Sequence, residues 1–393
     1  MTRLAPARLA AFAALFAFLV IVFGAFVRLS NAGLSCPDWP TCYGKATWPG
    51  HEQEIAHANA AFPERPFEDH KAWREQVHRM LAGTLGTLVF ALALVAAWRR
   101  RALLAMLLAA ALAAALGIVA YVRGAPAASG ALSLIAIGLP LVAAWRLDRA
   151  TPWRIAIATL AVVVFQAMLG MWTVTLLLKP IVVMGHLLGG LLTFALLAWV
   201  ALRLGGVPAP DALQRRLQPM VVVALVLLAL QIALGGWTSA NYAALACGMD
   251  FPKCAGSWWP ATDFREGFVL WRGIGVNYEG GVLDAAARAA IQIAHRIGAL
   301  VVFGHVAATA WLAWRRGLRR NGAALALLLV LQVGLGIANV RLLLPLPVAT
   351  AHNAVAVLLL FALLALLARV HGGDAAVTAS RLGSTAHRPG GGA

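Results

Sequence analysis

The stretch GAFVRLSNAGLSC at residues 24–36 decides the fold, because it returns as GGWTSANYAALAC at residues 235–247. The two stretches align without gaps, and each is followed by a second cysteine, Cys42 or Cys254. Internal sequence symmetry of this kind is typical of membrane proteins built from structural repeats. We therefore interpret the chain as two copies of one unit.

The repeat also places two histidines in each unit at matching positions. EQVHRMLAGTL at 75–85 matches QIAHRIGALVV at 292–302. Later in each unit a glutamine, Gln166 or Gln332, precedes a second histidine at equal spacing. The histidines concerned are His78 and His186 in the first unit, and His295 and His352 in the second.

Composition indicates an integral membrane protein. The chain has 393 residues and is 62% hydrophobic and 12% charged, whereas soluble domains carry about 25% charged residues. Its mean hydropathy is +0.81. Apolar runs long enough to cross a bilayer recur throughout. We predict about ten spans, at 9–27, 77–98, 102–122, 128–146, 155–178, 181–202, 219–240, 289–313, 322–344 and 348–369.

Four spans form each unit, in the order cysteine-loop helix, His-Arg helix, glutamine helix and second histidine helix. An even number of spans gives both copies the same orientation, so the repeats are parallel. The first unit carries an extra stretch, 102–146, which fits an inserted hairpin. The predicted fold is an all-α integral membrane protein of two parallel-repeat four-helix bundles. Its expected parts are 1–205, 206–370 and a disordered tail at 371–393.

The net charge of +17 reports topology, and we expect no nucleic-acid partner. Arginines gather at the same ends of successive spans, as the positive-inside rule requires of cytoplasmic loops. Both termini are then cytoplasmic, and the long loops at 28–76 and 241–288, which hold the cysteines, are periplasmic. The predicted location is a bacterial inner membrane. The clusters include Arg99, Arg100, Arg101, Arg315, Arg316, Arg319 and Arg320.

Histidines at membrane depth are costly and rare, so they mark a site by default. Paired imidazoles from neighbouring helices can hold a haem iron from both faces. A lone histidine at the end of a span is often a packing residue, but repetition at matched positions argues against that interpretation. His305 has no counterpart in the first unit and is read as structural. His51, His57 and His70 are read as solvated loop residues.

Two arginines follow histidines at the outer ends of spans, Arg79 and Arg296. Arginine pairs strongly with carboxylates such as the propionates of haem. The alternative is snorkelling toward outer lipid phosphates. Arg28 and Arg341 are weaker candidates for the same propionate role.

Glu75 distinguishes the units, because the second has Gln292 at the matching position. Glu75 and His78 share one helical face. A carboxylate beside a haem can act as a general base or stabilise a developing cation, whereas a neutral amide cannot. We expect the first unit to react and the second to hold a fixed cofactor. The alternative is a solvated glutamate at the membrane interface.

The cysteines form one close pair in each unit, Cys36 with Cys42 and Cys247 with Cys254. Both pairs lie in loops predicted outside the cell, where disulfides persist. Their spacings are not the short ones typical of zinc sites. We favour a disulfide in each, with metal binding as the alternative; redox activity of the first pair stays open.

The motif VRLSNAGLSCPDWPTC at 27–42, followed by Glu75, His78 and Arg79, resembles the haem A synthase family. The resemblance implies a membrane enzyme that oxidises the C8 methyl of haem O to a formyl group, giving haem A for cytochrome oxidase. It further implies substrate-haem ligands at His78 and His186, a functional Glu75, and an outer cysteine pair. The corresponding cofactor is haem b, with ligands His295 and His352. The family usually has eight spans, so the stretch at 102–146 departs from it.

Other functions explain part of the pattern. A di-haem b-type electron-transfer protein would account for the histidines, and so would a haem transporter or assembly chaperone. Neither explains the cysteine loops or Glu75. The expected partners are haem O and membrane lipid, with haem O synthase and cytochrome oxidase assembly factors as further candidates. The sequence is also compatible with a homo-oligomer.

Overall fold

A computed structural model describes residues 4–371, and it confirms an all-helical membrane fold. Among the described residues, ten helices are long and apolar enough to cross a membrane, as predicted. Three short helices, α2, α8 and α10, lie in the connections. The helices are α1 (Leu4–Leu29), α2 (Glu52–Ala61), α3 (Asp69–Ala97), α4 (Arg101–Val122), α5 (Pro126–Trp145), α6 (Pro152–Thr175), α7 (Pro180–Gly205), α8 (Ala212–Arg215), α9 (Gln218–Ala240), α10 (Phe264–Gly267), α11 (Ala285–Arg315), α12 (Arg319–Arg341) and α13 (Leu346–His371).

The two His-Arg helices begin earlier than hydropathy suggested. Helix α3 starts at Asp69 and α11 at Ala285, so each extends past the apolar stretch by polar turns. At the start of α11 the Asp284 side chain accepts a hydrogen bond from the Ala287 amide at 2.8 Å, which caps the helix. Glu75 and His78 consequently lie inside one continuous helix rather than at its end.

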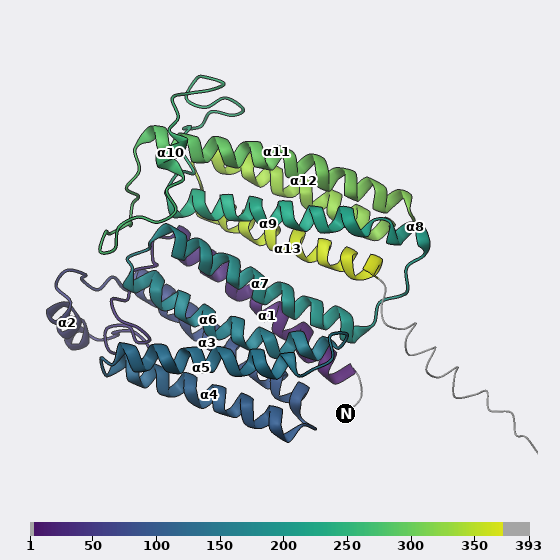
Figure 1. The fold of residues 1–393 in the computed structure, drawn as a ribbon. Coiled ribbons are helices and arrows are strands. Elements are labelled where there is room, and N and C mark those ends of the chain that lie inside the picture. Colours follow the sequence, from purple (N-terminus) through teal and green to yellow (C-terminus); the bar gives the residue numbers. More distant parts are fainter. Residues whose placement is uncertain (1–3, 372–393) are drawn as a thin grey trace, which may run out of the picture.

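The long helices pack as two groups (Figure 1). In one group α1, α3, α6 and α7 contact one another, and in the other α9, α11, α12 and α13 do so. The groups meet where α1 and α7 pack against α13 and α7 packs against α9. This packing agrees with one four-helix set per repeat, and the division into two domains stays our proposal.

The inserted hairpin, α4 and α5, lies at the outside of the first group (Figure 1). Its two helices pack along each other, α5 packs on α6, and α4 contacts α3 only sparsely. The helices come close at Gly117, where an added Cβ would lie 3.4 Å from the Leu132 Cβ. The hairpin therefore leaves the four-helix arrangement of the first unit intact.

The two units also share an unusual turn before the second histidine helix. Leu177 and Leu178 have φ of 50° and 58°, and the equivalent Leu343 and Leu344 have 58° and 60°. Such left-handed conformations are uncommon outside glycine. The same turn in both units starts α7 and α13 alike and so places His186 and His352 at equivalent heights. The disordered tail expected at 371–393 lies outside the described residues, apart from His371.

Candidate functional site

One continuous cavity of about 2180 Å³ runs through both helix groups. Ligand pockets usually measure about 300–1,000 Å³, so this cavity has room for more than one large ligand. Its lining is mostly apolar and includes Glu75 and Arg79. All four repeated histidines line it: His78, His186, His295 and His352.

In the first group, His78 on α3 faces His186 on α7. Their ring centroids lie 6.5 Å apart and their planes are nearly perpendicular, at 87°. Metal–imidazole bonds of about 2 Å would put the ring centres of a bis-imidazole complex about 6 Å apart. The spacing of these two rings therefore fits one iron held between them.

Each of the four histidines packs against a glycine of the preceding long helix. An added Cβ on Gly24 would lie 2.7 Å from Cε1 of His78, and one on Gly170 would lie 3.4 Å from Cε1 of His186. The second group repeats this arrangement: a Cβ on Gly235 would lie 3.2 Å from His295 and one on Gly336 would lie 3.2 Å from His352. We missed these glycines as site residues, although their equal position in each unit was a signal for them.

The imidazoles keep polar atoms available. The Nδ1 atoms of His78, His186 and His352 are buried without a hydrogen-bond partner among the described residues. Buried polar atoms are normally satisfied, so an unpartnered one calls for an explanation. Neutral imidazole is a common ligand of haem iron. In the first unit, the donor atoms, the spacing of the two rings and the glycine contacts together fit haem.

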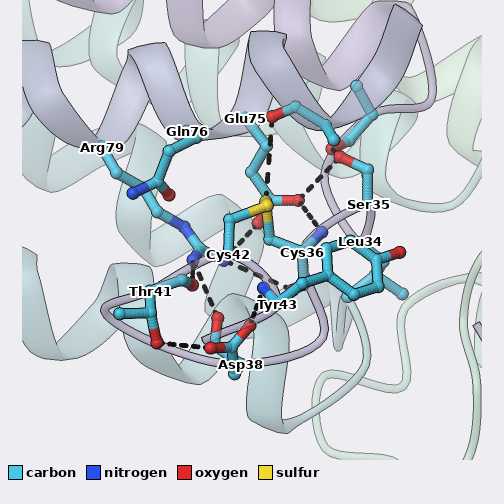
Figure 2. The surroundings of a disulfide bond; sticks show 12 residues. Leu34, Ser35, Cys36, Asp38, Thr41, Cys42, Tyr43, Glu75, Gln76 and Arg79 are labelled. Carbon is cyan, nitrogen blue, oxygen red and sulfur yellow. Dashed lines mark hydrogen bonds and ion pairs between the residues drawn. A yellow bond between two sulfur atoms is a disulfide. The ribbon is translucent and has the colours of Figure 1, made fainter. Parts of the chain in front are cut away.

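Glu75 lies against the first cysteine loop (Figure 2). Its Oε2 accepts hydrogen bonds from the Cys36 amide at 2.8 Å and from the Ser35 hydroxyl at 3.0 Å. Its Oε1 accepts one from Nη2 of Arg79 at 2.6 Å. Glu75 is only 5% exposed, so it is a buried, fully partnered carboxylate and not the solvated glutamate we weighed as an alternative.

The propionate candidates all contact main-chain carbonyls. Arg79 donates to Asp38 at 2.8 Å and Thr41 at 2.6 Å, besides its bond to Glu75. The other contacts are Arg296 with Asp250 and Lys253, Arg341 with Phe251, and Arg28 with Ser239. Arg79 and Arg296 thus fasten the cysteine loops to α3 and α11, a role that we did not foresee. Propionate binding by these arginines stays a prediction.

Both predicted disulfides are present. The S–S distance is 2.03 Å for Cys36–Cys42 and 2.02 Å for Cys247–Cys254. Within residues 4–371, no group of three or more His, Cys, Asp or Glu side chains is arranged to hold a metal ion. The metal-binding alternative for the cysteine pairs is therefore wrong in this structure.

The second unit lacks the glutamate network. Gln292 is 5% exposed, and its Oε1 has no hydrogen-bond partner in the described part of the chain. The loop of Cys247–Cys254 is held by main-chain contacts of Arg296 and Arg341, and position 292 carries a glutamine in place of the glutamate of the first unit. The difference between the units that Glu75 indicated in the sequence is therefore also a difference in hydrogen bonding.

The four histidines that the sequence placed outside the site behave as predicted. His305 Nε2 lies 3.0 Å from the main-chain oxygen of Met220, which ties α11 to α9. The loop histidines are exposed, and His70 is near Glu68 at 3.7 Å. The exposed ones are His51, His57 and His70.

Comparison with known proteins now identifies the family. The cytochrome oxidase assembly protein family, COX15-CtaA, matches residues 7–125 and 127–364. The chain belongs to this family. It is similar to Heme A synthase of Shewanella oneidensis, with 38% identity over 291 residues, which cover 73% of this chain and 72% of that one. It is also similar to Heme A synthase of Rhizorhabdus wittichii, with 28% identity over 375 residues, 89% of this chain and 90% of the other. The resemblance found in the sequence is confirmed, and the family match includes almost all of the hairpin α4–α5.

Proposed function

We propose that the chain is a haem A synthase, a membrane oxidoreductase that converts the C8 methyl of haem O to a formyl group for cytochrome oxidase. The proposal rests on one observation: the first unit contains both a facing pair of histidines and a buried glutamate on the same helix as one of them. His78 faces His186 across the cavity at 6.5 Å, and Glu75, on the same helix as His78, is fixed to the disulfide loop. The family and the relatives named above support it.

The two units take different roles in this proposal. His78 and His186 hold the substrate haem, and His295 and His352 hold a haem b that supplies redox chemistry when bound. Glu75 lies in the unit that reacts, whereas Gln292 stands at the matching position of the other. Because haem O has a lipid-like tail, a site between helices lets it enter from the bilayer.

Glu75 acts on the methyl region of the substrate. A carboxylate placed there stabilises positive charge that develops as the methyl is oxidised, or accepts its proton. Arg79 and the Cys36 amide keep the carboxylate in place. Two successive hydroxylations of the methyl, each a two-electron oxidation that needs an external oxidant and an oxygen source, would give a gem-diol, which loses water to leave the formyl group.

The membrane orientation of the protein is inferred from the distribution of arginines among its loops. We place the protein in a bacterial inner membrane with both termini in the cytoplasm and both cysteine loops in the periplasm, because arginine-rich ends mark cytoplasmic loops. Candidate partners are the enzyme that makes haem O and the factors that assemble cytochrome oxidase. An association of two or more copies is compatible with this arrangement.

The test is pigment analysis in a host that makes haem O but lacks haem A. Cells that express the chain should accumulate haem A, and the purified protein should contain haem b together with haem O or haem A. A Glu75→Gln variant expressed at the same level is the matched control. If only haem b is found and haem O remains unconverted, the chain is instead an electron carrier.

A further inference from the structure

The cavity beside the first histidine pair continues between α3 and the inserted hairpin. On α3 its lining extends from His78 to Phe90, about 18 Å along the helix by its rise per residue. The C-terminal half of α4 and the N-terminal half of α5 form the opposite wall. Their lining side chains are mostly small, among them Ala111, Ala114, Ala115, Gly130 and Ser133. An apolar channel thus leads from the histidines along the hairpin.

This channel is bounded at both ends. Beyond Phe90, Leu92 of α3 and Leu107 of α4 are fully buried in one hydrophobic core. At the other end Trp39 of the first cysteine loop lies edge-on to Tyr121 of α4, with ring centroids 5.7 Å apart, and both rings line the cavity. The hairpin is therefore anchored toward both ends and leaves room beside α3 between them.

Within the described chain, the second unit has neither the hairpin nor the glycines that line this channel. Gly83 and Gly86 of α3 line it, and the matching residues of α11 are Leu300 and Phe303. A Cβ added at Gly83 would meet nothing within 4 Å, so the space beside this glycine is open. Leu300 and Phe303 are exposed, because no hairpin covers α11 at this level. The first unit thus combines small side chains with a covering pair of helices.

We infer that this channel holds the farnesyl tail of haem O, and that the hairpin α4–α5 makes the first unit selective for a tailed haem. The inference rests on the proposed function, in which the substrate carries this tail and haem b, the cofactor of the second unit, does not. The unit with the hairpin and the glycines is the one that has to accept the tail. The length and the apolar lining of the channel suit an extended isoprenoid chain.

The tail in this channel also orients the substrate. Lipid is as apolar as the channel, so burial alone gives the tail little reason to leave the bilayer. Close packing in the channel instead fixes the rotation of the porphyrin in its own plane. That rotation decides which edge of the macrocycle meets Glu75, and correct placement of the reacting group is a large part of catalysis.

Membrane lipid is the competing occupant, because an acyl chain also fills a gap between helices. The two occupants differ in what a filled channel does to haem binding. If lipid lies there, a larger side chain displaces only lipid, and both haems bind as before. If the tail lies there, the same side chain weakens the binding of haem O and leaves that of haem b unchanged.

The test is a titration of the full-length protein, purified from a host without haem O, with haem O and separately with haem b, followed by absorbance. Gly83→Leu, which copies Leu300, should lower the affinity for haem O about tenfold, because a filled channel is overpacked by the tail. The affinity for haem b should not change. Gly138→Leu is the matched control: Gly138, on α5, has equal open space but lies outside the cavity lining, so neither affinity should change.

Two further variants complete the test. His78→Ala should abolish the titration with haem O, and a titration that survives it would overturn the inference, because the tailed haem then binds elsewhere. Ala114→Leu fills the channel from α4 and serves if Gly83→Leu does not fold, as followed by thermal unfolding.

Unchanged haem O affinity in folded Gly83→Leu or Ala114→Leu protein would assign the channel to lipid and overturn the inference. Equal losses for both haems would also overturn it, because the leucine then disturbs the porphyrin and not the tail. These readings need no turnover. A chain that discriminates the two haems in this way but makes no haem A would refute the proposed function and leave the channel assignment standing.

Discussion

Arg79 links Glu75 to the first cysteine loop. Its Nη2 bonds Glu75 Oε1 at 2.6 Å, and its Nη1 bonds the carbonyl oxygens of Asp38 at 2.8 Å and Thr41 at 2.6 Å. The two side chains are largely buried, with exposures of 13% and 6%. Glu75 thus depends on the loop for its position, and the loop depends on the ion pair.

Replacing Arg79 with alanine should therefore do more than remove a charge. The buried Glu75 carboxylate would lose its cation, and breaking a buried pair costs about 3–5 kcal/mol. We expect a clear drop in the unfolding temperature and loss of haem A formation, measured on the purified protein and in the pigment assay. Arg296→Ala is the control, because Arg296 bonds only carbonyls in its loop and should cost less. Equal losses in both variants would contradict this account.

Glu75→Gln tests the carboxylate with little change of shape. The amide keeps an oxygen for the Cys36 amide or for Arg79, and it copies the residue that the second unit carries, Gln292. We expect haem still to bind, as seen by absorbance, and haem A formation to fall by about a hundredfold or more. Gln292→Glu should not create activity in the second unit. Normal conversion by Glu75→Gln would remove Glu75 from the proposed chemistry.

The two disulfides should differ in what they support. Cys36 presents its amide to Glu75 at 2.8 Å, whereas Gln292 receives no such bond in the described structure of the second unit. The double change Cys36→Ser with Cys42→Ser should therefore lower haem A formation strongly, beyond what its loss of stability explains. Cys247→Ser with Cys254→Ser should mainly lower stability. Haem A yield and thermal unfolding, measured on both variants, decide the matter; the reverse ranking would speak against it.

Much of this arrangement is predictable from sequence, for physical reasons. Hydropathy finds the spans because a bilayer requires long apolar helices. The repeat singles out His78 and His186 as the two site histidines of the first unit, because each has a counterpart at the same position in the second unit. The reach of α3 back to Asp69 was not predictable in this way, because its first turns are polar. The contacts of Arg79 also depend on how the cysteine loop folds back over α3, which no local pattern reports.

Topology can be tested with single introduced thiols, since all cysteines of the chain are in disulfides. Val276, in the second cysteine loop, is 40% exposed, and Leu213, in α8 on the other side, is 60% exposed. Val276→Cys should react with a membrane-impermeant maleimide in intact cells. Leu213→Cys should react only after the inner membrane is opened. The opposite pattern would reverse the proposed orientation.

Gly24 should be intolerant of any side chain. A Cβ there would lie 2.7 Å from Cε1 of His78, a separation that real Cβ atoms do not show, and neither helix α1 nor α3 can shift freely in the packed group. Gly24→Ala should push the His78 ring out of line with His186, so the first unit should lose its haem while the second keeps its own.

Gly304→Ala is the matched control for this change. Gly304 also lies inside a long helix, α11, and nothing is within 4 Å of an added Cβ. There the substitution should stabilise the protein by about 0.5–1 kcal/mol through helix propensity alone. Haem content per protein and the unfolding temperature separate the two cases. Full haem content in Gly24→Ala would show that haem binding does not require the space beside the His78 ring that the missing Cβ of Gly24 leaves open.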